Sequence, residues 1–145
     1  MTPTIHLDEH PSGEDLDRVA RGVRDFNRAV AGQEPPRSVG CFLRDEDGCV
    51  VGGVWGMLWG SSLRVLALWV DESLRGQRHG ATLLRELESY AAGQGYLLAH
   101  VETLDFQARP FYERQGYQLF GELEEVAPGH TLYFLRKDLP PAPPS

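Results

Sequence analysis

The residues best suited to chemistry lie in the middle of the chain, around two glycines in a basic loop. Gly76 and Gly80 allow a backbone to approach an anion closely, and Arg75 and Arg78 beside them carry positive charge. The loop follows an apolar run that ends at Val70 and precedes a helical pattern. Such a loop directs free backbone N–H groups and the positive helix end to one point. The pattern predicts a phosphate or pyrophosphate site, although an ordinary turn with two glycines has the same appearance.

A second set of candidates consists of titratable side chains further along the chain. His100 and Glu102 share one face of an expected strand because side chains alternate along a strand, and Asp105 follows directly. Tyr112 lies on an expected short helix, and its hydroxyl can donate a proton with an ordinary pKa of about 10. A solvated strand end and a packed aromatic residue would show the same pattern. The chain contains neither HExxH nor CxxC, so we expect no metal site.

Hydrophobic spacing divides the chain into helices and strands that would hold these candidates. Helical spacing predicts a first helix between Gly13 and Gly32, a second at residues 78–93 and a short third at 106–115. Apolar runs predict strands at residues 39–44, 49–59, 63–70, 96–103, 117–123 and 131–137. Glycines within the second of these strands predict a bulge or a close backbone approach, at Gly52, Gly53 and Gly56. The mixed order of the elements predicts an α/β or α+β fold.

The helix predicted at residues 78–93 has one apolar and one charged side. Its expected buried stripe consists of Leu83, Leu84, Leu87, Tyr90 and Ala91. Its expected solvent side includes Arg85, Glu86 and Glu88.

Length and charge narrow the class of protein. The chain has 145 residues, enough for one domain, and a net charge of −7. A protein this acidic repels nucleic-acid phosphates and anionic lipids, so we expect neither as a partner. The apolar segments are shorter than a membrane-spanning helix requires, and two cysteines give no disulfide framework. We therefore expect a cytoplasmic protein.

Two motifs resemble those of the GNAT superfamily of N-acetyltransferases, most closely its small bacterial members. Residues 75–80 look like the acetyl-CoA loop, usually [QR]-x-x-G-x-[GA], and residues 105–117 are similar to N-x-x-A-x-x-x-Y-E-x-x-G-[FY]. The motifs are separated by one helix and one strand, as in the family. Two positions depart from the pattern, since Arg78 replaces the usual middle glycine and Asp105 the usual asparagine. The pair of motifs is far more specific than either motif alone.

The resemblance implies a fold and a cofactor site. It implies one domain at residues 1–139 with a mixed, mostly antiparallel twisted sheet of six to seven strands and about four helices. Residues 140–145 would form a proline-rich, disordered tail. The co-substrate would be acetyl-CoA, without a metal, with its pantetheine arm beside Leu68, Trp69 and Val70. The remaining cofactor contacts would come from Arg75, Gly76, Gln77, Arg78, His79, Gly80, Ala81, Asp105 and Ala108.

The resemblance also implies a reaction and its partners. A primary amine of a small molecule or peptide would attack the thioester directly, and Tyr112 would protonate the leaving thiolate. Glu102 or a water molecule would take the proton of the amine, and His130, in the loop of an expected hairpin, would border the acceptor. The family also makes a homodimer plausible. An alternative is a non-catalytic acyl-CoA-binding module for sensing or interaction, and a purely structural domain would bind no CoA at all.

Overall fold

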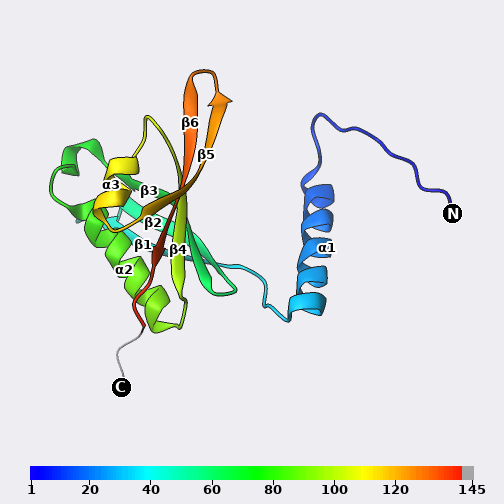
Figure 1. The fold of residues 1–145 in the computed structure, drawn as a ribbon, viewed down its shortest axis with the longest axis horizontal. Coiled ribbons are helices and arrows are strands. Elements are labelled where there is room, and N and C mark those ends of the chain that lie inside the picture. Colours follow the sequence, from blue (N-terminus) through cyan, green and yellow to red (C-terminus); the bar gives the residue numbers. More distant parts are fainter. Residues whose placement is uncertain (142–145) are drawn as a thin grey trace. The chain divides into compact units, whose positions relative to one another are not determined.

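The structure is a computed structural model, and it describes residues 1–141 of the chain (Figure 1). The chain divides into two compact units, residues 1–35 and the residues from Pro36 onward. Of the three α-helices among residues 1–141, the second unit holds two, together with the sheet. No helix among the described residues combines the length and the hydrophobicity needed to cross a bilayer. The predicted tail at residues 140–145 lies mostly outside the described residues.

The first unit contains one amphipathic helix, α1 (Gly13–Ala31). Ser12 caps its start by accepting a hydrogen bond from the Asp15 N–H at 3.1 Å, and Gly32 ends it in a left-handed conformation. Its apolar stripe has the helical spacing expected from the sequence. Within this unit the stripe has no partner element, and none of the helix's residues is buried.

The second unit is built on a six-stranded sheet with the order β1-β2-β3-β4-β6-β5 (Figure 1). All neighbouring strands are antiparallel except β3 and β4, which are parallel. The strands are β1 (Arg37–Arg44), β2 (Val50–Trp59), β3 (Ser62–Val70), β4 (Leu98–Leu104), β5 (Gln118–Ala127) and β6 (His130–Asp138). This sheet confirms the predicted fold class.

One 3-10 helix and two α-helices complete the described part of the second unit. A 3-10 helix, η1 (Glu72–Leu74), follows β3, and α2 (His79–Gly93) connects it to β4. The short helix α3 (Arg109–Arg114) follows β4, and it is shorter than predicted because residues 105–108 form turns. The α2 and α3 helices contribute to one core with the sheet, through Leu84 and Leu87 of α2 and Tyr112 of α3.

A β-bulge opposite Gly56 shapes the middle of the sheet. Trp55 pairs with Ala67 and Gly56 with Val65, so Leu66 is an extra residue in β3. A Cβ atom at position 56 would lie 2.3 Å from the carbonyl oxygen of Arg64, so only glycine allows this approach. The close backbone approach predicted for this strand is confirmed at Gly56.

A buried polar cluster corrects the expected solvent face of α2. Glu88, assigned to solvent from the sequence, is 7% exposed. It accepts hydrogen bonds from the Tyr117 hydroxyl at 2.6 Å and from Lys137 Nζ at 2.8 Å. A buried carboxylate needs such partners, and these come from parts of the chain that helical periodicity cannot reveal. Tyr90, expected in the stripe, is instead 42% exposed beside Arg37.

Candidate active site

A cleft lies between the end of β3, the start of α2 and helix α3. Its volume is about 1230 Å³, above the ~300–1,000 Å³ typical of pockets for drug-sized ligands. The lining comes from residues 66–70 of β3, the loop and first turns of α2, residues 101–103 of β4, and Gln107, Ala108, Phe111, Tyr112, Arg114 and Gln115. A cleft of this size suits a ligand larger than most drug-sized molecules.

The cleft exists because β3 and β4 separate. Their parallel pairing begins at Ser62 and ends where Val65 meets Val101, next to the bulge. Beyond this point β3 stays paired with β2 as far as Val70, but its other edge faces the cleft. Backbone N–H and C=O groups on that edge can therefore bond to a ligand. Leu68, Trp69 and Val70 line the cleft, as the family resemblance implies.

The loop before α2 holds its backbone in the left-handed region at two positions. Gly76 has a φ of 80°, and Arg78, the N-cap residue of α2, has a φ of 65°. A non-glycine residue in this region is strained by about 1–2 kcal/mol, which explains why a glycine is usual there in the family that the loop resembles. The loop is anchored because Arg75 Nε donates to the Val70 carbonyl at 3.0 Å.

The first turn of α2 directs its backbone toward the cleft. Its first intrahelical bond runs from the Thr82 N–H to the Arg78 carbonyl. The N–H groups of His79, Gly80 and Ala81 therefore have no partner within the helix, and all three residues line the cleft. The positive end of the helix dipole adds to their attraction for an anion.

Tyr112 differs from the neighbouring buried tyrosine in what its hydroxyl does. The Tyr112 and Tyr117 rings pack edge to face at 5.5 Å, but the Tyr117 hydroxyl is bound to Glu88. The hydroxyl of Tyr112, which lines the cleft, takes part in no hydrogen bond among residues 1–141. Since no buried side-chain oxygen in this part of the chain lacks a partner, solvent in the cleft reaches it. Burial raises the pKa of Tyr112 to about 12, so it stays a proton donor at neutral pH.

Glu102 reaches the cleft where the two strands separate. Its Oε1 accepts a hydrogen bond from Arg64 Nη2 at 3.2 Å, and both side chains are partly exposed to solvent. Partial burial, together with the positive charge of Arg64, lowers the pKa of the adjacent His100. The lowered pKa favours the neutral form of the histidine at pH 7.

Two residues expected at the cofactor site lie outside the cleft. Gln77 is exposed and does not line it. Asp105 does not line it either, because its carboxylate binds the β5–β6 hairpin, with Oδ1 3.0 Å from His130 Nδ1 and Oδ2 accepting from the Thr131 N–H. Desolvation opposes ionisation of Asp105, but these hydrogen bonds outweigh it and lower the pKa of the carboxyl group. Phe106 stacks edge-on against the His130 ring at 4.8 Å.

The structure brings together the other expected residues and adds some that sequence patterns missed. Tyr112, Glu102 and Ala108 line the same cleft as the loop and the β3 edge. The cleft also includes Arg85 and Arg114, which the sequence assigned to solvent or left without a role. The spacing in the sequence indicates Arg85 as a cleft residue, because it follows Arg78 by two helical turns and so lies on the same side of α2.

Comparison with known proteins agrees with the fold. The sequence model of the Acetyltransferase (GNAT) family matches residues 5–117. Blasticidin-S acetyltransferase of Streptomyces morookaense is 39% identical over 125 residues, which are 85% of this chain and 92% of that protein. The crystal structure of an acetyltransferase from Bacillus cereus superimposes with a TM-score of 0.80 at 30% identity and covers 92% of this chain and 98% of its own.

One solved structure that shares this fold contains coenzyme A. An aminoglycoside 6′-N-acetyltransferase complexed with coenzyme A has a TM-score of 0.65 at 20% identity, over 90% of each chain, and so shares the fold. By these similarities the chain is an acyltransferase. The chain belongs to the acetyltransferase (GNAT) family, which confirms the resemblance inferred from the two motifs.

Proposed function

We propose that this protein transfers an acetyl group from acetyl-CoA to a primary amine of a small molecule. The single observation that carries the proposal is the Tyr112 hydroxyl, which has no hydrogen-bond partner among residues 1–141 and belongs to a cleft that a helix N-terminus also lines. A helix N-terminus suits the pyrophosphate, and the unpaired edge of β3 suits the amides of the pantetheine arm. The names of the blasticidin-S and aminoglycoside relatives support a small-molecule acceptor.

In the proposed reaction the neutral amine attacks the thioester carbonyl directly. A carbon–nitrogen bond forms, and the tetrahedral species then collapses as its carbon–sulfur bond breaks. Tyr112 gives its hydroxyl proton to the leaving CoA thiolate and regains one from solvent. The proton lost by the amine goes to Glu102 or to water. Backbone N–H groups at residues 79–81 hold the pyrophosphate while the acyl end of the donor lies between the separated strands.

The proposal is tested by incubating the protein with acetyl-CoA and a panel of primary amines. We expect free CoA thiol to form at the same rate as the acetylated amine, with one acceptor class strongly preferred. Binding of acetyl-CoA without thiol release for any amine would favour the non-catalytic sensor instead. If neither acetyl-CoA nor CoA binds, the protein is better interpreted as a purely structural domain.

Replacing Glu102 by glutamine in the same assay tests the base. We expect kcat/KM at pH 7 to fall about 100-fold, because the amide keeps the size of the side chain but cannot accept a proton. Stability should change little, since the pair with Arg64 is exposed. The matched control is Glu113→Gln, which removes another exposed, arginine-paired carboxylate that does not line the cleft. An unchanged kcat/KM for Glu102→Gln would assign the proton to water.

A further inference from the structure

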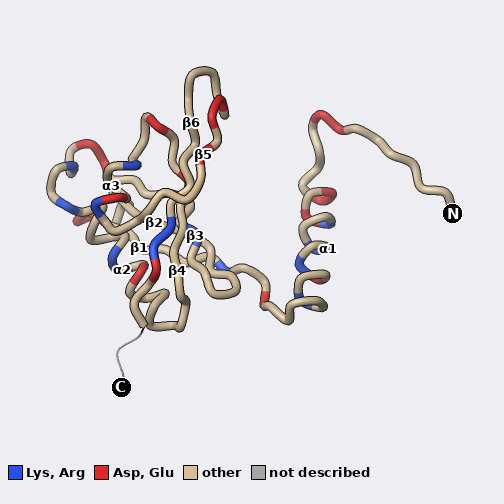
Figure 2. Tube along the Cα trace, viewed as in Figure 1, with Lys and Arg blue, Asp and Glu red and all other residues tan. Residues whose placement is uncertain are grey.

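The walls of the cleft are basic, although the chain as a whole is acidic. Four arginines line the cleft against one carboxylate, Glu102, whereas the sequence has 14 basic and 21 acidic residues. The four are Arg75, Arg78, Arg85 and Arg114. Figure 2 shows basic residues on the loop before α2 and on both helices beside the cleft. A cavity with this excess of positive charge concentrates anionic ligands.

Two of the four arginines belong to the pyrophosphate end of the cleft. Arg75 is tied to the end of β3 through its hydrogen bond to the Val70 carbonyl. Arg78 immediately precedes the first residue of α2. Together with the amides of the first helical turn, these side chains account for one anionic group, the pyrophosphate.

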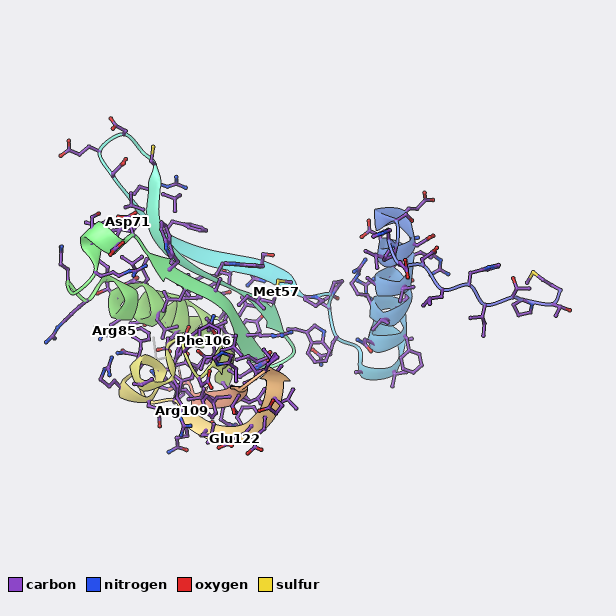
Figure 3. The ribbon with its side chains drawn as sticks, turned by 90° about the horizontal axis from the view of Figure 1, so that it is seen from above. Met57, Asp71, Arg85, Phe106, Arg109 and Glu122 are labelled. Carbon is purple, nitrogen blue, oxygen red and sulfur yellow. The ribbon has the colours of Figure 1, made fainter. Side chains whose placement is uncertain are left out.

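Arg85 lies further along the cleft. It follows Arg78 by seven residues, so it projects from the same side of α2 about 10 Å along the helix axis. Figure 3 labels Arg85 on α2 beside helix α3. At this distance from the helix start, Arg85 is not required to bind an anion that sits only at the first turn of α2.

Arg114 is the last residue of α3 and lines the cleft from that helix. Helix α3 begins near the start of α2, because a Cβ atom at Gly80 would lie 3.6 Å from the Phe111 ring. The chain after α3 reaches the middle of α2, where Tyr117 binds Glu88. These two contacts place α3 beside the part of α2 that carries Arg85, and Arg114 on α3 lines the same cleft.

Both arginines are available to a ligand. Among the ion pairs of residues 1–141, none involves Arg85 or Arg114, whereas Arg109 on α3 is paired with Glu113 at 3.1 Å. Their side chains are exposed at the cleft wall. Two guanidinium groups that enter one cleft from two helices suit a phosphate monoester, which accepts hydrogen bonds through several oxygens.

We propose that Arg85 and Arg114 bind the 3′-phosphate on the ribose of CoA and so select acetyl-CoA over donors that lack this phosphate. CoA carries this phosphate in addition to its pyrophosphate, which matches two separate groups of arginines. A pantetheine arm on a carrier protein, or 3′-dephospho-CoA, would leave Arg85 and Arg114 without their anion. The inference rests on the proposed function, because it takes acetyl-CoA as the donor.

The test is isothermal titration calorimetry of the wild-type protein with CoA and with 3′-dephospho-CoA. We expect CoA to bind about 10- to 100-fold more tightly, the range for charge-assisted hydrogen bonds to one phosphate. In the double variant Arg85→Gln/Arg114→Gln the two ligands should bind equally, with the affinity for 3′-dephospho-CoA unchanged. The control Arg44→Gln removes one arginine charge outside the cleft, and it should still prefer CoA over 3′-dephospho-CoA as the wild type does.

The outcomes separate this inference from the proposed function. Equal binding of both ligands to the wild type would overturn the inference and leave the proposed function intact, whether or not the double variant folds. Equal weakening of both ligands in a folded double variant would also overturn it, because the arginines would then serve the shared part of the ligand. If neither ligand binds the wild type, the proposed function fails and this inference fails with it.

Discussion

Tyr112→Phe is expected to lower kcat about 100-fold or more while affinity for acetyl-CoA stays nearly unchanged. The substitution removes only the hydroxyl, and the ring keeps its edge-to-face contacts with Phe111 and Tyr117. Without the hydroxyl, the CoA thiolate must leave unprotonated or wait for a proton from water. The measurement is thiol release at saturating acetyl-CoA and amine, together with calorimetric titration of CoA.

Tyr117→Phe is the matched control, because it removes the hydroxyl of the other buried tyrosine. This variant loses the hydrogen bond to Glu88, so its free energy of unfolding should fall by about 1–3 kcal/mol. Its kcat should stay close to that of the wild type. If Tyr112→Phe keeps full kcat, or if both variants lose kcat equally, Tyr112 is not the acid.

The pKa of Tyr112 also fixes the pH dependence of this step. Burial raises the pKa to about 12, so the hydroxyl keeps its proton at every pH below that value. Activity that depends on this proton is therefore present at neutral pH and is lost only as pH rises through about 12. A fall of kcat between pH 8 and pH 10 would have to come from another group.

Gly56→Ala is expected to destabilise the protein by about 3 kcal/mol, because the backbone leaves no space for a methyl group. The added Cβ would lie 2.3 Å from the Arg64 carbonyl oxygen, an atom of the backbone of β3 that cannot rotate away. Relief of this contact must push β2 and β3 apart at the bulge, next to the point where β3 leaves β4. The variant should therefore also bind acetyl-CoA more weakly. Urea unfolding measures the stability.

Gly93→Ala provides the control for this prediction. Gly93 is the last residue of α2, and a Cβ atom there would meet nothing within 4 Å. Alanine also has a higher helix propensity than glycine, so this variant should be as stable as the wild type or slightly more so. Equal urea midpoints for Gly56→Ala and Gly93→Ala would show that the bulge tolerates a side chain.

Most of the fold and of the cleft could be predicted from local sequence patterns. Strand β3, the glycine loop and the start of α2 follow one another in the sequence. Their spacing is therefore enough to predict where the free backbone N–H groups of α2 lie. The glycine at position 56 likewise signals a close approach without any knowledge of its partner. These features depend on short-range geometry, which residue types encode directly.

The features that sequence patterns missed depend on contacts between distant segments. Asp105 binds His130 and Thr131, which lie 25 and 26 positions further along the chain. Glu88 is buried by Tyr117 and Lys137, which no periodicity within α2 can reveal. A charged residue on a helix has the same signature whether it faces water, a buried partner or a cleft, and for this reason Arg85 was assigned to solvent.

The most direct test of the account is a thermal-shift titration of the wild type and of Gly80→Trp with acetyl-CoA. A ligand at 100-fold its Kd adds about 2.7 kcal/mol of stability, which raises Tm by several degrees. We expect this shift for the wild type. We expect none for a folded Gly80→Trp, whose indole would occupy the cleft beside Phe111. An unshifted wild type, or an equal shift in both proteins, would contradict the assignment of the cleft to acetyl-CoA.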